Sequence, residues 1–257
     1  MKKNIFISPH LDDAVVSCGE YIKKLKNHKE DILVITVFTG APSAELLSAV
    51  AKQFHGAWGL GDDAVLARKK EDEAAMKLLN VDYIYLDEHE CLYRIDRQGK
   101  SKYNQISEIH TNDFSKDMDT IERLNSRLVE IFDKLEVGKV FVPLGIGRHI
   151  DHIVSRKCIE DIAENRPLEI FYYEEIPYVC TGQDAGWKVD LTKGLVCSIV
   201  NITDEEWLHK VEGINCYKSQ LGIMWGCEEK QMNQLNEASQ KYSKDCRSIR
   251  FWGRNPL

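Results

Sequence analysis

From residue 4 to residue 173 the chain alternates short apolar runs with longer amphipathic segments, and this alternation limits the fold more than any other feature. The amphipathic segments carry apolar residues three and four positions apart, which is the spacing of one buried helix face. Strands that alternate with helices are typical of βαβ units, so we predict an α/β fold with a largely parallel sheet covered by helices. The predicted strands are 4–8, 31–39, 83–86, 139–142 and 168–173, and the predicted helices are 14–26, 62–79, 117–135 and 151–164.

The alternation weakens after residue 174. No linker and no internal repeat divides the sequence. We therefore predict a single domain over 1–257, with an α/β core at 1–173 and a C-terminal extension of mixed strands and helices at 174–257. The predicted elements of the extension are a strand at 195–202, helices at 204–217 and 228–242, a break at 222–226 and an apolar edge at 251–253.

The composition is that of an ordinary globular protein and argues against several classes. A net charge of −7 argues against a nucleic-acid-binding surface. The chain has no run of about 18 apolar residues, so we expect no membrane partner, and the apolar stretch at 5–7 is too short for a signal peptide. We expect a cytoplasmic protein whose eight cysteines, none in a Cys-x-x-Cys pair, are reduced. The sequence leaves the oligomeric state open, a homo-oligomer included.

A cluster of metal-ligating side chains follows the first predicted strand. Its sequence is Pro9-His10-Leu11-Asp12-Asp13. Imidazole nitrogens and carboxylate oxygens are ligands suited to zinc or another divalent ion. At His-x-x-Asp spacing, His10 and Asp13 can both turn inward from a strand-to-helix corner. Asp12, beside them, could then accept a proton from a metal-bound water as general base.

A second cluster, His149-Ile150-Asp151-His152, follows the predicted strand at 139–142. Ligands of parallel sheets gather beyond the carboxyl ends of the strands, so we expect both clusters at one edge. His152 could complete a His-His-Asp metal set with open positions for water and substrate. A protonated His149 could stabilise an oxyanion and donate a proton to a leaving amine, with Asp151 holding its imidazole charged and oriented. The pattern indicates metal-assisted hydrolysis of an amide.

Each cluster taken alone also has a simpler explanation. Asp13 could cap the helix that begins near Ala14, and His149 and His152 could be surface histidines that precede a helix. The occurrence of both clusters at strand ends of one predicted sheet favours an assembled metal site over these explanations.

The two clusters resemble the motifs of the LmbE-like, or PIG-L-like, N-acetylglucosaminyl deacetylases. The family motif Pro-His-Pro-Asp-Asp-Glu is matched by residues 9–14, and the motif His-Pro-Asp-His by residues 149–152. The resemblance implies a Rossmann-like α/β zinc hydrolase that removes N-acetyl groups from amino sugars. Iron also suits such a ligand set. The roles it implies are metal ligand for His10, Asp13 and His152, general base for Asp12, and stabiliser of the tetrahedral intermediate for His149.

The chain departs from these motifs at Leu11, Ala14 and Ile150, none of which is a predicted ligand. Leu11 and Ile150 replace prolines, which leaves the ligand geometry possible but less constrained. Ala14 replaces a glutamate that is not among the three ligands, so the chemistry can survive its loss.

Weaker similarities indicate residues that contact substrate. Arg68-x-x-Glu71 resembles a family helix whose arginine can reach substrate. Asp87 and Arg94 lie in segments that resemble the wall of the substrate pocket, within a polar connection over 87–112 that is either a substrate loop or a surface excursion. Arg148 stands near the place where some relatives carry an oxyanion-assisting tyrosine. It could bind transition-state charge or a substrate anion, or be an ordinary charged loop residue.

We therefore predict a metal-dependent hydrolase that removes an N-acetyl group from a small-molecule amino sugar or amino-sugar conjugate. One alternative is an amidase acting on another small N-acyl substrate, such as a thiol conjugate or an antibiotic precursor. The second alternative is a catalytically silent ligand-binding module, which would have no need of the base Asp12. A dinucleotide-binding enzyme is disfavoured because the chain contains no Gly-x-Gly-x-x-Gly segment.

Overall fold

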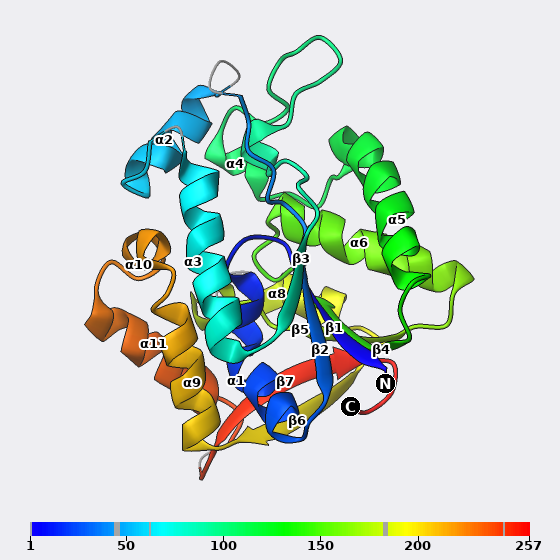
Figure 1. The fold of residues 1–257 in the computed structure, drawn as a ribbon, viewed down its shortest axis with the longest axis vertical. Coiled ribbons are helices and arrows are strands. Elements are labelled where there is room, and N and C mark those ends of the chain that lie inside the picture. The colour runs from blue at the N-terminus through cyan, green and yellow to red at the C-terminus, as the bar shows by residue number, and fades with distance from the viewer. Residues whose placement is uncertain (1, 44–46, 62, 182–184, 244) are drawn as a thin grey trace.

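The computed structural model describes residues 2–43, 47–61, 63–181, 185–243 and 245–257. These residues form a sheet of seven strands in the order β3-β2-β1-β4-β5-β7-β6 (Figure 1). The strands β1 to β5 run parallel, whereas β7 runs antiparallel to both β5 and β6. The strands are β1 (Lys3–Ser8), β2 (Asp31–Thr36), β3 (Asp82–Tyr85), β4 (Val137–Pro143), β5 (Glu169–Tyr173), β6 (Val196–Ile202) and β7 (Arg247–Gly253).

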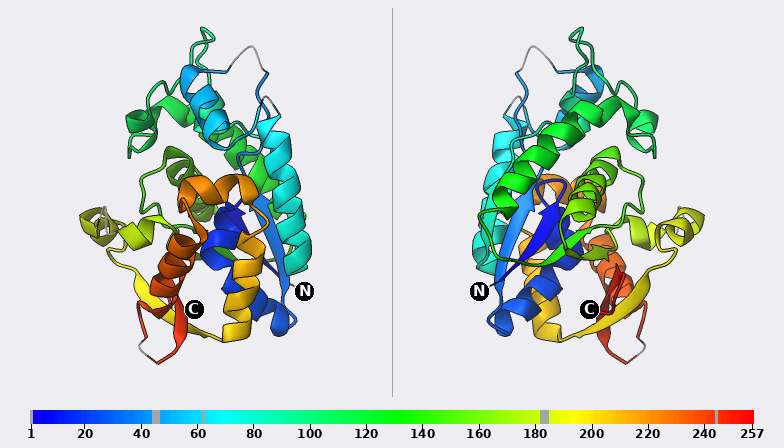
Figure 2. Two further views of the ribbon diagram at one scale, coloured as in Figure 1. Left: turned by 90° about the vertical axis from the view of Figure 1, so that its left-hand side faces the viewer. Right: turned by 90° about the vertical axis from the view of Figure 1, so that its right-hand side faces the viewer.

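Helices cover both faces of this sheet (Figures 1 and 2). On one face α1 packs against α3 and α9, and on the other α5 packs against α6. None of the helices in the described part of the chain is long and apolar enough to cross a membrane. The helices are α1 (Asp13–Asn27), α2 (Ala49–Ala57), α3 (Ala64–Leu79), η2 (Cys91–Tyr93), α4 (Ile106–Ile109), η3 (Ser115–Asp117), α5 (Met118–Phe132), α6 (Ile150–Asn165), α7 (Tyr178–Thr181), α8 (Ala185–Leu191), α9 (Asp204–Ile214), α10 (Lys218–Met224) and α11 (Glu228–Gln240).

A row of aromatic rings forms the centre of the core. Phe6 of β1, Phe141 of β4 and Phe171 of β5 occupy aligned positions on neighbouring strands. The ring centroids of Phe6 and Phe141 lie 4.4 Å apart, and those of Phe141 and Phe171 lie 5.7 Å apart. Stacked rings on adjacent strands bury a large apolar area and favour one register of the sheet. This register fixes the relative positions of the strand ends that carry the site.

The predicted α/β fold is confirmed, and several elements differ from the prediction, α2, α10 and β7 among them. The helix α2 was not predicted, because it is short and buries few of its residues. The helix α10 occupies part of the predicted break at 222–226. The predicted apolar edge at 251–253 is the end of a full strand, β7, whose apolar alternation is interrupted by arginines. Residue 62, where we predicted a helix to begin, lies outside the described residues.

The topology places both sequence clusters at one edge of the sheet. β1 and β4 are neighbouring parallel strands, so their carboxyl ends lie side by side. The helices α1 and α6 begin at these ends. The C-terminal extension belongs to the same sheet, because β7 hydrogen-bonds to β5.

Candidate active site

The first cluster lies at the corner where β1 ends and α1 begins. Ser8 Oγ donates a hydrogen bond to the His10 carbonyl oxygen (2.7 Å) and accepts one from the Ala14 N–H (3.0 Å). The His10 N–H donates to Asp13 Oδ2 at 2.8 Å. These bonds hold the corner in one conformation, in which His10, Asp12 and Asp13 are all buried.

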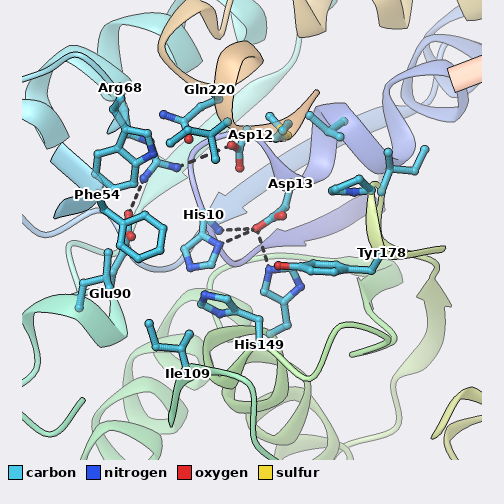
Figure 3. A pocket seen from close by; sticks show the side chains of 18 residues that line it. His10, Asp12, Asp13, Phe54, Arg68, Glu90, Ile109, His149, Tyr178 and Gln220 are labelled. Atoms are coloured by element: carbon cyan, nitrogen blue, oxygen red, sulfur yellow. Dashed lines mark hydrogen bonds and ion pairs between the residues drawn. The ribbon is translucent and has the colours of Figure 1, made fainter. Parts of the chain in front are cut away.

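The two clusters meet at the carboxylate of Asp13. His10 Nδ1 and His152 Nε2 lie 3.1 and 3.3 Å from the same oxygen, Asp13 Oδ2 (Figure 3). Ligand atoms about 2.1 Å from a tetrahedral zinc ion lie roughly 3.4 Å from one another. The three predicted ligands therefore have donor atoms and spacings that fit a divalent metal ion. His149 lies beside them, with a ring nitrogen within 4.8 Å of nitrogens of His10 and His152.

In both His10 and His152, the ring nitrogen that points away from Asp13 contacts a carboxylate. His10 Nε2 lies 2.9 Å from Asp151 Oδ2, and His152 Nδ1 lies 3.1 Å from Glu175 Oε1. Histidines that bind metals commonly donate their other N–H to such a carboxylate, which fixes the tautomer and the ring orientation. This arrangement leaves His10 Nδ1 and His152 Nε2 to face a metal ion.

Glu175 is a site residue that the sequence analysis missed. It is fully buried, and its carboxylate also accepts hydrogen bonds from the N–H groups of Gly145 (2.6 Å) and Ile146 (3.3 Å). The carboxylate therefore ties the loop after β4 to the end of β5. The one signal in the sequence was its position just beyond the predicted strand at 168–173, and a single glutamate there belongs to no motif.

Asp151 has a different contact from the one predicted. We expected its carboxylate to orient His149, but the carboxylate contacts His10, the Arg94 guanidinium and the Cys91 N–H. His149 instead receives the Asp151 backbone N–H on its Nδ1, at 3.3 Å, because it caps α6. Burial alone would raise the pKa of the Asp151 carboxyl, but Arg94 and His10 hold that pKa well below its ordinary value. Asp151 is therefore ionised and can orient His10.

His149 favours the neutral form. Burial, and then the neighbouring His10, lower the pKa of His149 well below its ordinary value. Since Nδ1 accepts the backbone N–H of Asp151, the proton of the neutral ring is on Nε2. We predicted a protonated His149, whereas the structure favours a neutral imidazole that can still donate one hydrogen bond.

Asp12 lies next to the ligand set. Burial, and then the neighbouring Asp13 carboxylate, raise the pKa of Asp12 to about 7. A general base works best with a pKa near the operating pH. The Arg68 guanidinium lies 3.7 Å from Asp12 Oδ2 and is paired with Glu90 at 2.8 Å. Asp12 thus has the position and the pKa of a base, and Arg68 approaches it from α3 as predicted for a residue at the substrate.

These groups line a cavity of about 250 Å³. We call the polar part of its lining the floor (Figure 3). The floor is formed by His10, Asp12, Asp13, His149 and His152. Around the floor stands an apolar wall contributed by α2, η2, α4 and α10. The wall consists of Phe54, Trp58, Leu92, Ile109, Ile223 and Met224.

The helix α3 holds α10 in place at this wall. The Tyr217 hydroxyl donates to Asp72 at 2.7 Å, and Ser219 donates to Glu71 through its N–H (2.9 Å) and its hydroxyl (2.6 Å). Asp72 and Glu71 belong to the helix that also carries Arg68. One helix thus positions both a charged group of the site and part of the wall.

Three residues that we predicted to bind substrate do not line the cavity. Arg94 lies behind Asp151. Asp87 is exposed and contacts Lys69 (2.6 Å), because it follows the buried Leu86 just after β3 and points outward. The Arg148 guanidinium lies 5.4 Å from the ring centroid of Trp187. The connection over 87–112 nevertheless reaches the site through Glu90, Leu92 and Ile109.

Comparisons with known proteins find deacetylases similar to this chain. A 2'-N-acetylparomamine deacetylase of Niallia circulans is 26% identical over 187 residues, which are 68% of this chain and 66% of that protein. The solved structure of the zinc-inhibited form of teicoplanin deacetylase is 26% identical and superposes with a TM-score of 0.87, over 98% of this chain and 97% of that one. An N,N'-diacetylchitobiose deacetylase from Pyrococcus horikoshii, 19% identical with a TM-score of 0.58 over 97% and 82% of the two chains, shares the fold.

A family model matches a larger part of the chain than the two motifs alone. The model is described as PIG-L, GlcNAc-PI de-N-acetylase, and it matches residues 5–163, which include both clusters. This match covers more than half of the sequence. The predicted resemblance is confirmed, and the chain belongs to the PIG-L family of de-N-acetylases.

Proposed function

We propose that this chain is a zinc-dependent hydrolase that removes the N-acetyl group from an amino sugar carried on a conjugate. The observation that carries the proposal is the meeting of His10 and His152 at Asp13, with the Asp12 carboxylate beside them. A silent binding module has no need of a buried carboxylate with a raised pKa at that position. The relatives named above, deacetylases of teicoplanin and of 2'-N-acetylparomamine, support an amino-sugar substrate.

His10, Asp13 and His152 would hold the metal ion. Two nitrogens and one oxygen from protein, with room for a reacting group, are typical of catalytic zinc, and iron is the alternative. When bound, such an ion polarises the acetyl carbonyl and lowers the pKa of a coordinated water. Asp151 and Glu175 would orient the two imidazoles from behind.

Asp12 and His149 have different roles in the hydrolysis of the amide. Asp12 takes a proton from the attacking water while the water oxygen bonds to the acetyl carbonyl carbon. His149 donates its Nε2–H to the oxygen that becomes negative in the tetrahedral intermediate. The C–N bond then breaks, and the proton held by Asp12 passes to the departing nitrogen. The products are acetate and the free amine of the sugar.

The cavity indicates the part of the substrate that is enclosed. Its volume of about 250 Å³ lies slightly below the usual range for ligand pockets, roughly 300–1,000 Å³. We propose that it encloses the acetamide and the sugar ring, and that the conjugate extends past Phe54 and Ile223. Since these are apolar side chains, an uncharged aromatic or aliphatic conjugate fits better than a charged one.

We also propose that residues 1–257 form one domain and that the protein works in the cytoplasm. The pairing of β7 with β5 supports a single domain. All eight cysteines are free thiols, which suits a reducing compartment.

The test combines metal analysis with a substrate panel. Purified wild type and Asp12→Asn are analysed for zinc and iron, and acetate release is measured from N-acetylglucosamine, its aryl glycosides, 2'-N-acetylparomamine and N-acyl thiol conjugates. Acetate release from amino sugars by the wild type, but not by Asp12→Asn, supports the proposal. Release from the thiol conjugates alone would identify a different amidase. A protein that contains metal and hydrolyses none of these compounds would contradict the proposed function.

A further inference from the structure

Gln220 is a polar side chain of the cavity that belongs neither to the floor nor to the apolar wall. It stands on α10, lines the cavity and is only 5% exposed. In Figure 3 it appears across the cavity from His149, with Asp12 between the two in this view. Gln220 takes no part in the proton transfers proposed above, because a side-chain amide carries no titratable proton.

A chain of hydrogen bonds determines how the Gln220 amide is turned. Ser219 Oγ has a single proton, which it donates to Glu71 Oε2 at 2.6 Å. Ser219 Oγ can therefore only accept a hydrogen bond from Gln220, and an amide oxygen has no proton to donate. The bond of 2.8 Å between the two side chains is accordingly made by Gln220 Nε2. Ser219 holds the Nε2 end of the amide, which leaves Oε1 as the end that faces the cavity.

Oε1 of Gln220 receives no donor from the protein. In the part of the chain that the structure describes, neither a side chain nor a backbone N–H donates to this oxygen. Because the side chain is almost wholly buried, an acceptor left unpaired here costs free energy. A compound that fills the cavity can supply the missing donor. An amide oxygen cannot stabilise an oxygen that becomes negative, so we assign Gln220 to substrate binding rather than to the chemical step.

The donor that fits this position is a hydroxyl of the sugar. In the proposed reaction the floor serves the acetamide itself, with Asp12 at its nitrogen and His149 at its carbonyl oxygen. Gln220 is then available to the next donor along the ring. In N-acetylglucosamine the acetamido group is on C2, between C1 and C3. When C1 carries the conjugate its oxygen has no proton, so the neighbouring donor is the hydroxyl on C3.

We propose that Gln220 Oε1 accepts a hydrogen bond from the sugar hydroxyl next to the acetamido group. The inference rests on the proposed deacetylase function and names a residue that determines its substrate specificity. A site that pairs with a substrate hydroxyl rejects an analogue without that hydroxyl, because the buried acceptor then stays unpaired. The enzyme is therefore selective for sugars whose hydroxyl on C3 is free.

The first experiment compares two substrates of the wild type. They are the phenyl glycoside of N-acetylglucosamine and its 3-deoxy analogue. We expect KM to be about 10- to 100-fold higher for the deoxy compound, with kcat nearly unchanged, because the contact is the same in the bound substrate and in the transition state. Equal KM values would overturn the inference and leave the deacetylase function intact. A wild type that releases acetate from no amino sugar would overturn both.

The second experiment removes the acceptor. Gln220→Leu keeps most of the side-chain volume, and we expect its KM for the phenyl glycoside to rise by the same factor as in the first comparison. The ratio of KM between the two glycosides should fall close to one, because the two changes remove the same contact. Metal content and kcat should stay at their wild-type values, since the floor is unchanged.

The matched control is Gln231→Leu. Gln231 is another buried glutamine, on α11 outside the cavity, where its Nε2 donates to Asn215 at 3.2 Å. This variant should keep the full preference for the hydroxyl. Gln220→Met, with an unbranched side chain of similar length, replaces Gln220→Leu if the latter does not fold. A wild-type preference for the hydroxyl in a folded variant without the Gln220 amide would overturn the inference.

Discussion

The floor and the apolar wall of the cavity are built in different ways. The floor side chains stand at the ends of buried strands and are fixed by several polar contacts, as Asp13 is by His10 and His152. The wall residues stand mainly on short helices: α2, α4 and α10 have nine, four and seven residues. The exposed fraction of His152 is 2%, and that of Ile223 is 42%. The floor is therefore fixed by polar contacts between buried side chains, whereas the wall is apolar and includes exposed side chains such as Ile223.

This difference separates the reaction from the choice of substrate. Changing a floor residue should alter metal content or turnover on every substrate. Changing a wall residue should alter the preference among conjugates and leave the chemical step intact. We therefore expect the effect of a substitution to decrease in a fixed order. The metal ligands come first, then the base Asp12, then the carboxylates behind the imidazoles, such as Glu175, and last the wall.

The largest effect is expected from Asp13→Ala. Asp13 Oδ2 lies near both His10 Nδ1 and His152 Nε2, so its loss should reduce the metal content from about one ion per chain to none. Acetate release should disappear with the metal. Elemental analysis of the purified variant is the measurement. His149→Ala, which removes a neighbouring nitrogen, should retain the metal, and its loss there would assign His149 to the ligand set.

Asp12→Asn should keep the metal and lose turnover. The amide cannot accept a proton from water, and general-base catalysis contributes about 100- to 10,000-fold to the rate. We expect kcat to fall by that factor with unchanged metal content, as measured by acetate release at saturating substrate. A variant with wild-type kcat would remove Asp12 from the role of base and leave its neighbour Glu90 to be tested.

The sequence predicted the floor because its residues lie in two short motifs at predictable places. Once 4–8 and 139–142 are taken as parallel strands, His10, Asp13 and His152 must lie at one edge of the sheet. The direction of each side chain was harder to predict. The Asp151 carboxylate turns toward His10, while the Asp151 N–H donates to the His149 side chain that caps α6. These details depend on the first turn of α6.

The wall and the groups behind the floor could not be predicted in the same way. Glu175 and Tyr178 follow β5 and belong to no motif, so only the packing of β5 beside β4 brings them to the site. The helices α2 and α10 are too short for a strong apolar period. Asp87 was expected at the substrate, but it is exposed at the surface. Such features depend on tertiary contacts, which one sequence does not display.

A smaller effect is expected from Glu175→Gln. The carboxylate orients His152 without contacting the metal, and loss of such a partner typically weakens metal affinity by about 10- to 100-fold. Competition with a chelator measures this affinity. The neighbouring Glu174→Gln is the control, because Glu174 bonds Trp252 (2.7 Å) and Arg250 (2.7 Å) outside the site. Equal losses of affinity in both variants would show that folding, rather than the contact with His152, is responsible.

The smallest effect, and the sharpest test of the comparison, is expected from Ile223→Ala on the wall. Ile223 lines the cavity but contributes no polar group to the reaction. We expect kcat/KM to fall about tenfold for an aryl glycoside of N-acetylglucosamine, which would lose apolar contact, and to stay unchanged for the free sugar. Leu208→Ala removes another exposed apolar side chain, from α9, and should change neither value. An equal fall for both substrates would mean that the wall supports the floor, and the two regions would then act as one.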